Sequence, residues 1–234
     1  MEPKYKRILL KVSGEALAGP AKTGIADDML LQVADQVKAI HDLGVEIGIV
    51  VGGGNFWRGR TSEGMDRATA DYMGMLATVI NSLGLQDAFK RRGIPVRVMT
   101  AIEMNKVADT YTNRGAVEAL KNGEVVIFGA GLGSPFFSTD TTAALRAVEI
   151  GADVILLAKK VDAVYDSDPE KNPNAKPFKN LTHQEVLEKR LGVMDSTAAS
   201  LCMDNGVAIH VFGLAEPENV FKAVCGEPIG TVIE

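Results

Sequence analysis

The chain has 234 residues and a formal net charge of −5 at pH 7, and 46% of its residues are hydrophobic. A chain of this length can bury a substantial core as one large domain or two small ones, and its negative charge argues against nonspecific binding to nucleic acid, which needs a basic surface. No apolar run approaches the ~20 residues needed to span a bilayer, the first residues lack a signal-peptide core, and Cys202 and Cys225 lack the spacing of a metal site. We therefore expect a cytoplasmic enzyme with reduced cysteines that binds neither nucleic acid nor membranes.

Strand and helix patterns alternate along almost the whole chain, which predicts an α/β fold with a mainly parallel sheet covered by helices. After a first strand at 8–10, further strands are expected at 45–51, 94–99, 124–129, 153–158 and 207–212, with a short strand at the end of the chain. Helices are expected at about 27–43, 69–92, 112–122, 139–151, 195–205 and 217–225. A short helix is also expected after Thr182, because Thr182 and Glu185 have the spacing of a capping box.

Residues 160–180 depart from this alternation. The segment is rich in Asp, Asn and Pro and has little apolar periodicity. Long irregular segments within a compact domain are usually lids or binding loops, so we expect a functional loop here. We treat residues 1–234 as a single domain and place any internal division near residue 152, which gives halves of about 1–152 and 153–234.

Three of the predicted strands run directly into a glycine turn. The turns are Lys11-Val12-Ser13-Gly14, Gly52-Gly53-Gly54-Asn55 and Gly129-Ala130-Gly131-Leu132-Gly133-Ser134. Glycine lets a backbone approach a ligand closely, and successive N–H groups, especially where a helix starts, form a site for phosphate oxygens. Three such turns with Lys11 and Arg58 beside them indicate more than one phosphate group in a single crevice.

The two common phosphate-binding motifs do not account for these turns. A P-loop requires a Gly-Lys dipeptide, which the chain lacks. The third turn approaches the G-x-G-x-x-G pattern of dinucleotide-binding folds, but its last position is Ser134, and no acidic residue closes the strand at 153–158 to hold a ribose.

Six segments distributed over nearly the whole chain share the pattern of one kinase family. They are Lys11–Leu17, Val51–Asn55 with Arg58-Gly59, Asp71–Thr78, Pro135–Asp140, Val161–Pro169 and Val193–Asp195. With these segments in this order the chain resembles the amino-acid kinase family. The Asp71–Thr78 segment resembles the uridylate branch of that family, the bacterial UMP kinases.

The resemblance implies a three-layer α/β/α sandwich and an activity. A member of this branch transfers the γ-phosphoryl group of MgATP to UMP, giving UDP and ADP in de novo pyrimidine nucleotide biosynthesis. The resemblance also implies Mg²⁺ that is carried by ATP rather than by a metal site of the protein, a homohexamer built from dimers, and GTP and UTP as effectors. Phosphoryl transfer builds negative charge on the moving group, so such a site mainly needs positive charge and positioning.

The resemblance assigns four residues to the transfer step. Lys11 would neutralise the transferred group, and Asp140 would hold Lys11 in place. Arg58 would reach the nucleotide phosphates, and Asp195 would order the phosphates that bind magnesium. The ATP-binding residues implied in the same way are Lys11, Val12, Ser13, Gly14, Gly54, Arg58, Lys159, Tyr165 and Asp168. The UMP-binding residues are Gly53, Asp71, Leu132, Gly133, Ser134, Pro135, Phe136, Phe137, Ser138 and Thr139.

Within the acceptor set, Asp71 would bond the ribose hydroxyls, and residues 132–139 would wrap the uracil and the UMP phosphate. The chain departs from the family pattern at Leu132 and Ser134, where relatives often carry threonine and asparagine. Leu132 has no side-chain hydrogen-bonding group, so base recognition there must use backbone groups or Thr139.

Other interpretations remain open on the residues alone. Asp140 and Asp195 stand where helix caps are expected, and Asp71 and Arg58 could face solvent. A kinase of the same fold that acts on a carboxylate or carbamate is one alternative, and the Asp71–Thr78 segment argues against it. A non-catalytic nucleotide-binding protein is another, and the presence of both Lys11 and Asp140 argues against that.

The helix expected at 69–92 carries apolar residues around much of its circumference. A helix that only covers a core needs one apolar stripe. We therefore expect this helix to form a dimer interface as well as to pack on the sheet.

Overall fold

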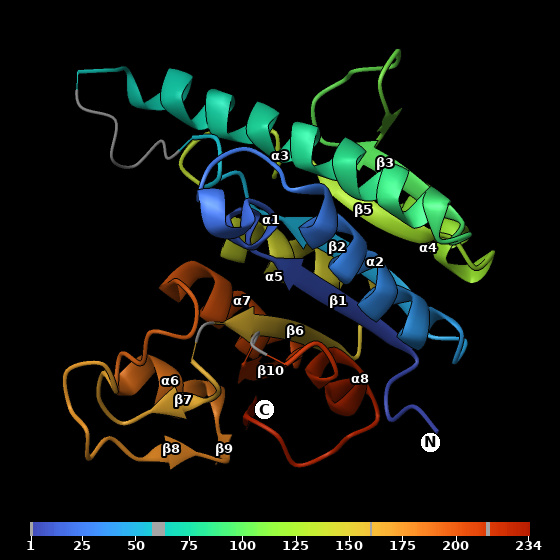
Figure 1. Cartoon of the computed structure of the whole chain (residues 1–234). Coiled ribbons are helices and arrows are strands. Elements are labelled where there is room, and N and C mark those ends of the chain that lie inside the picture. Colours follow the sequence, from blue (N-terminus) through green and yellow to red (C-terminus); the bar gives the residue numbers. More distant parts are fainter. Residues whose placement is uncertain (1, 58–63, 160, 214–215) are drawn as a thin grey trace.

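A computed structural model of the chain describes residues 2–57, 64–159, 161–213 and 216–234, and it is built on a central nine-stranded sheet (Figure 1). Arg58, one of the predicted site residues, lies outside the described residues. The strands of this sheet are β1 (Arg7–Val12), β2 (Glu46–Val51), β3 (Val96–Thr100), β4 (Asp109–Thr110), β5 (Val125–Gly129), β6 (Val154–Lys159), β9 (Asn180–Leu181), β10 (Ala208–Gly213) and β11 (Thr231–Ile233). Their order across the sheet is β4-β3-β5-β2-β1-β6-β10-β11-β9. All neighbouring strands run parallel except β10 and β11.

Helices cover both faces of this sheet and make a three-layer α/β/α sandwich, as predicted. The helices are α1 (Gly14–Leu17), α2 (Asp27–His41), α3 (Arg67–Arg91), α4 (Asn113–Lys121), α5 (Thr139–Ile150), α6 (His183–Glu188), α7 (Ser196–Asn205) and α8 (Asn219–Val224). One core contains buried side chains of α2, α3 and α8, and the other contains those of α4, α5, α6 and α7. Successive side chains of β1 alternate between the two cores, Ile8 and Leu10 in the first and Leu9 in the second, because side chains of a strand point to opposite faces.

The central strand β1 pairs with strands from both halves of the chain. Lys11 lies opposite Val50 of β2 on one side and opposite Leu157 of β6 on the other. The two halves proposed from the sequence therefore share one continuous sheet. The division near residue 152 stays a prediction.

The segment 160–180 was expected to be irregular, and this expectation is wrong in part. Residues Val164–Tyr165 (β7) and Pro177–Phe178 (β8) pair as a small antiparallel sheet. Two-residue strands leave no recognisable alternation in a sequence, which explains why the pattern did not reveal them.

None of the helices in the described part of the chain is long and apolar enough to cross a membrane.

The predicted elements differ from the observed ones mainly at their ends. Helix α3 begins at Arg67, two residues before the predicted start, because the carboxylate of Asp66 caps it by accepting a hydrogen bond from the Thr69 N–H at 2.9 Å. The capping box before α6 is confirmed, with Thr182 and Glu185 each accepting a hydrogen bond from the other's backbone N–H. The short helix α1 and the strands β4 and β9 were not predicted.

Candidate active site

The carboxyl ends of β1, β2, β5 and β6 meet at one edge of the sheet, where the glycine turns follow. The connection from β1 to β2 runs through α2 on one face, whereas the connection from β5 to β6 runs through α5 on the other. In open α/β sheets, crevices form outside the carboxyl ends of strands where connections leave to opposite faces. This topology therefore places the predicted site residues around a common crevice.

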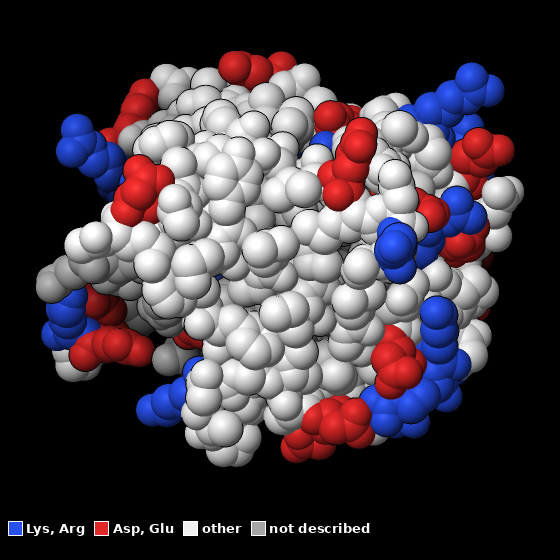
Figure 2. Space-filling model, turned by 90° about the horizontal axis from the view of Figure 1, so that it is seen from above, with Lys and Arg blue, Asp and Glu red and all other residues white. Residues whose placement is uncertain are grey.

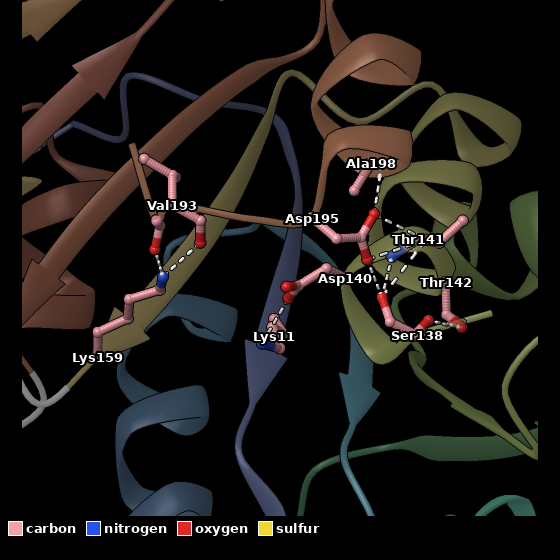
Figure 3. Close-up of polar contacts among 10 residues, drawn as sticks. Lys11, Ser138, Asp140, Thr141, Thr142, Lys159, Val193, Asp195 and Ala198 are labelled. Atoms are coloured by element: carbon pink, nitrogen blue, oxygen red, sulfur yellow. Dashed lines mark hydrogen bonds and ion pairs between the residues drawn. The ribbon is translucent and has the colours of Figure 1, made fainter. Parts of the chain in front are cut away.

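Lys11, near the end of β1, forms an ion pair with Asp140 in the first turn of α5 (Figure 3). The Nζ of Lys11 lies 2.6 Å from Oδ1 of Asp140, and both side chains are about one-fifth exposed, at 22% and 23%. The pair is the contact that the family resemblance implies for these two residues. A partly buried cation held at a strand end by one carboxylate is positioned to meet an anionic ligand, because its own partner restricts its movement.

Asp195 joins the beginnings of two helices. It caps α7 by accepting a hydrogen bond from the Ala198 N–H at 3.0 Å, and it also accepts hydrogen bonds from the hydroxyls of Ser138 and Thr141 (Figure 3). Ser138 in turn caps α5 by accepting from the Thr141 N–H at 3.1 Å. The positive ends of α5 and α7 therefore lie beside each other, and this arrangement favours an anion. The cap interpretation of Asp195 is correct, and it is compatible with a ligand-binding role.

Gly14 is required by the close approach of the first two glycine turns. A Cβ atom at Gly14 would lie 2.4 Å from the carbonyl oxygen of Gly52 and 2.5 Å from Oδ1 of Asn55. No side chain fits in this space, so the backbone at Gly14 lies directly against the second turn.

The second turn is held by a buried amide pair that the sequence analysis missed. Asn81 of α3 is fully buried, and its Nδ2 donates to the Gly52 carbonyl at 2.7 Å and to Oδ1 of Asn55 at 2.8 Å. Asn55 is 3% exposed, and its Nδ2 donates to Oδ1 of Asn81 at 2.9 Å and to the Gly24 carbonyl at 2.7 Å. A polar residue inside an apolar helix pattern was the available signal, but it does not reveal its partner.

A cavity of about 440 Å³ lies beside the second turn and α3. The predicted site residues that line it are Gly53, Gly54, Asp71, Phe137, Ser138 and Thr139. Other lining residues were not predicted as ligand contacts, and they include Trp57, Met75, Thr78, Phe128, Gly131 and Thr142. Leu132, Gly133, Ser134, Pro135 and Phe136, which were predicted to contact UMP, are not among the described residues that line the cavity.

Asp71 is held at the wall of this cavity, and it does not face solvent freely. Its side chain is 14% exposed, and Oδ2 accepts hydrogen bonds from Arg67 Nε at 2.8 Å and from the Phe136 N–H at 2.8 Å. Phe136 has a φ of 74°, which is unusual for a bulky residue, and the guanidinium of Arg67 lies 5.6 Å from its ring centroid. These contacts connect α3 to the predicted acceptor loop.

A second cavity, of about 400 Å³, is lined by three of the predicted ATP contacts. Lys159, Tyr165 and Asp168 all line it, together with Leu191, Gly192 and Val193. Asp71 and residues 137–139 line the first cavity and not this one. Asp71 therefore lies apart from Lys159, Tyr165 and Asp168. The predicted sets are not fully divided in this way, because Gly54, predicted for ATP, lines the first cavity, and Lys11, Val12 and Ser13 line a third cavity of about 250 Å³.

Lys159 extends from the end of β6 toward the backbone that precedes α7. Its Nζ donates to the carbonyls of Gly192, at 3.0 Å, and Val193 (Figure 3). Burial lowers the pKa of the Lys159 ammonium, while the nearby Asp140 carboxylate opposes this change and the Lys11 ammonium adds to it. Lys159 therefore interacts electrostatically with both residues of the Lys11–Asp140 pair.

Tyr165 and Asp168 are more exposed and have local partners. The Tyr165 hydroxyl donates to Asp162 Oδ1 at 2.7 Å, and this hydrogen bond raises the pKa of Tyr165. Asp168 forms an ion pair with Lys171 at 3.1 Å, and the hydrogen bond from Lys171 lowers the pKa of the Asp168 carboxyl. To bind a ligand through the same atoms, Tyr165 would give up its hydrogen bond to Asp162, and Asp168 its ion pair with Lys171.

The described residues contain no group of three or more His, Cys, Asp or Glu side chains arranged to hold a metal ion. Asp140 and Asp195 are carboxylates at the starts of α5 and α7, and each already has a partner. Carboxylate oxygens are the ligands that Mg²⁺ prefers, usually as one or two together with phosphate oxygens and water. These two residues therefore fit an ion that arrives with a nucleotide.

Comparison with known proteins gives the same family over nearly the whole chain. The family model described as "Amino acid kinase family" matches residues 6–213. The solved UMP kinase of Bacillus anthracis is 42% identical with a TM-score of 0.95, covering 98% of this chain and 96% of its own. The UMP kinase of Ureaplasma parvum is 36% identical with a TM-score of 0.93 and 99% coverage of both chains. The uridylate kinase of Archaeoglobus fulgidus is 28% identical with a TM-score of 0.72, covering 97% of this chain and 99% of its own. The strand-end lysine, its helix-start aspartate and these matches lead to one conclusion: the chain belongs to the amino acid kinase family.

Proposed function

We propose that the chain is a UMP kinase, which transfers the γ-phosphoryl group of ATP to UMP in pyrimidine nucleotide biosynthesis. The observation that carries this proposal is the Lys11–Asp140 ion pair at the edge of the sheet, together with two cavities. We call the first, which Asp71 lines, the acceptor cavity, and the second, which Lys159 lines, the donor cavity. The solved UMP kinases that the chain resembles over nearly its full length support the choice of substrate.

In this proposal UMP occupies the cavity lined by Asp71, Gly53 and Thr139, and ATP occupies the cavity lined by Lys159, Tyr165 and Asp168. Asp71 bonds the ribose hydroxyls of UMP, and residues 132–139 enclose its base and phosphate. A phosphate oxygen of UMP attacks the γ-phosphorus directly, so no side chain has to act as a nucleophile.

Lys11 meets the charge that grows on the moving phosphoryl group. Asp140 fixes the position of Lys11, and preorganised charge of this kind stabilises a transition state more than it stabilises a flexible ground state. The N–H groups of Val12, Ser13, Gly14 and Gly54 bind the phosphates of ATP, and Arg58 is proposed to do the same. Asp195 would order the phosphates of ATP that carry Mg²⁺, and the ion would supply positive charge that neutralises part of the phosphate charge.

The chain is also proposed to assemble through α3. The helix exposes Tyr72, Met73, Leu76 and Ile80, at 44%, 36%, 48% and 49%. Seen from above, the side where α3 lies in Figure 1, the surface has a broad central area without Lys, Arg, Asp or Glu (Figure 2). An apolar area of this kind on a helix supports contact with a second copy. A homohexamer with GTP and UTP as effectors follows only from the family resemblance.

We further propose that the protein works in the cytoplasm. Both cysteines are free, and burial raises the pKa of the Cys202 thiol to about 12, which makes this thiol unreactive.

The experiment that tests the activity measures ADP release with a panel of acceptors. UMP is expected to be the preferred acceptor over CMP, AMP and GMP, and aspartate, glutamate and carbamate are expected to be inactive. The Asp71–Thr78 segment, which resembles the uridylate branch, argues against an acidic amino acid or carbamate as the acceptor. Preference for an amino acid or carbamate would replace the proposal with another kinase activity of the same fold, and no ADP release with any acceptor would favour a binding protein.

A further inference from the structure

Thr78 is a buried polar residue on the inner face of α3, and the assigned site residues do not explain it. It lies three residues before Asn81 and four before Ser82, so the three side chains share one helix face. All three are buried, at 8%, 0% and 0%. Asn81 holds the Gly52–Asn55 turn, and Ser82 donates only to the Thr78 carbonyl within the helix, at 2.8 Å.

The Thr78 hydroxyl connects α3 to the third glycine turn. Its Oγ1 donates to the Met75 carbonyl at 2.7 Å and accepts a hydrogen bond from the Ala130 N–H at 2.9 Å. Ala130 follows directly after β5, is fully buried, and has a φ of 61°. An L-residue pays for the left-handed conformation, and a buried N–H without a partner is also costly. Ala130 has the left-handed conformation and also a buried N–H. The hydroxyl of Thr78 removes the cost of the buried N–H, because it accepts a hydrogen bond from it.

The turn that begins at Ala130 forms part of the acceptor cavity. Gly131 lines the cavity, and the Gly133 N–H closes the turn on the Ala130 carbonyl at 2.9 Å. Gly131 and Gly133 also have positive φ, 56° and 74°. A Cβ atom at Gly133 would lie 2.9 Å from the Ala101 carbonyl oxygen, so this side of the turn packs closely on the backbone of Ala101 and has no room for a side chain. At the start of the turn, the Ala130 N–H donates to the hydroxyl of Thr78.

We infer that Thr78 is a positioning residue for the acceptor, because it fixes the Ala130–Gly133 turn through the Ala130 N–H. This inference rests on the proposed function, since it takes the nucleoside monophosphate as the ligand of the cavity that the turn lines. Thr78 itself also lines the cavity, but its hydroxyl is engaged within the protein, because it donates to the Met75 carbonyl and accepts from the Ala130 N–H. We therefore expect it to act through the turn. The consequence is that binding of UMP, and not of ATP, depends on this hydroxyl.

The test compares two variants at one position. Thr78→Val keeps the shape of the side chain and loses the hydroxyl, whereas Thr78→Ser keeps the hydroxyl and loses the methyl group. Ser82→Ala is the matched control, because it removes a buried hydroxyl from the same helix face whose hydrogen bond stays inside α3. Steady-state kinetics give KM for UMP, KM for ATP and kcat for each, and thermal unfolding gives Tm.

Thr78→Val is expected to raise KM for UMP about tenfold or more, because a displacement of about 1 Å at a reacting group can cost on the order of 10²-fold. KM for ATP should change less than twofold, and Thr78→Ser and Ser82→Ala should both resemble the unchanged protein. If Thr78→Val does not fold, Thr78→Ala gives the same comparison.

Three results would overturn the inference while leaving the activity intact: an unchanged KM for UMP in Thr78→Val, equal increases for UMP and ATP, or the same increase in Thr78→Ser. A lower Tm of Thr78→Val with unchanged KM values would likewise show that the Thr78 hydroxyl contributes to stability alone. If the unchanged protein does not phosphorylate UMP, the proposed function itself is wrong and the inference falls with it.

Discussion

The Nζ of Lys11 and Oδ1 of Asp140 lie 2.6 Å apart, one at the end of a central strand and the other in the first turn of a helix. The two residues reach this distance because β1 is central in the sheet and α5 begins at the same edge. The helix start favours the negative charge of Asp140, and Asp140 then holds the lysine where phosphate oxygens would arrive.

Lys11→Met should lower kcat by roughly 10²–10³-fold, the scale expected for loss of one charge or donor aimed at a transition state. The fold should survive, because the side chain contributes an ion pair at a partly exposed strand end and little packing. Steady-state ADP release and circular dichroism measure the two properties. Lys38→Met is the control, because Lys38 pairs with Asp42 on the exposed surface of α2. Near-normal turnover of Lys11→Met would show that another group neutralises the phosphoryl charge.

Asp71→Asn and Asp168→Asn should affect different substrates, because the two carboxylates line different cavities. Asp71→Asn should raise KM for UMP more than KM for ATP, and Asp168→Asn should do the reverse. The measurement is KM for each substrate at saturating concentration of the other. Equal effects on both substrates, or the opposite pattern, would refute the assignment of the cavities.

Thr139→Val should weaken the preference for UMP over CMP, whereas Leu132→Thr should change it little. Uracil presents O4 where cytosine presents an amino group, so the site needs a donor toward O4, and a mismatched pair typically costs a few kcal/mol. Thr139 lines the acceptor cavity, and Leu132 is not among its described lining residues. The decisive quantity is kcat/KM for both nucleotides. A large gain in selectivity from Leu132→Thr, with none lost in Thr139→Val, would reverse this prediction.

Leu76→Glu and Ile80→Glu on α3 should dissociate the assembly, because each places a charge in an exposed apolar surface where a second copy is proposed to pack. Sedimentation at several concentrations should show an oligomer, most simply a hexamer, for the unchanged protein and smaller species for the variants. Gln184→Glu, a change at an exposed position on α6, should not alter sedimentation. The interface prediction fails if the unchanged protein is a fully active monomer.

Stability should fall as the pH decreases below about 6.5. His210 is 2% exposed, and its Nε2 lies 2.7 Å from the Ile229 carbonyl oxygen. Burial lowers the pKa of His210 from its ordinary value of 6.5, the hydrogen bond with the Ile229 carbonyl opposes this change, and the charge of Lys4 adds to it. Below pH 6.5 the unfolded chain therefore binds a proton that the folded chain does not, which favours unfolding. Urea unfolding from pH 7.5 to 5 measures this, and His210→Gln should flatten the dependence. An identical dependence in the variant would assign the effect to other groups.

The strongly periodic elements could be predicted from the sequence because one face of each packs on the sheet. Helix α2 and strand β2 agree with their predicted ranges to within about two residues. Lys11, Asp140 and Asp195 could be chosen because the glycine turns and helix starts next to them are local features. The contact between Lys11 and Asp140 could be expected only from the family resemblance, since it depends on the order of strands across the sheet.

The parts that could not be predicted depend on distant partners. Asn81 and Thr78 interrupt an apolar helix pattern, but nothing local indicates that they bond Gly52 and Ala130. Lys159 was chosen for ATP, and its bonds to the Gly192 and Val193 carbonyls arise from the packing of the segment before α7 against β6. Residues 132–136 were predicted to contact UMP, but they are not among the described residues that line the acceptor cavity. The sequence of a loop of mixed composition does not show which of its side chains point toward a cavity.

Helix α3 holds two glycine turns through neighbouring side chains on its inner face, and it exposes apolar side chains on its outer face. A shift of this single rigid body would move both turns together and would disturb the outer surface as well. Changes in substrate preference during evolution, or in a redesign, are therefore constrained to side chains at the cavity wall. Insertions or kinks in α3 would alter phosphate binding, acceptor choice and self-association at once, so we expect this helix to tolerate them least.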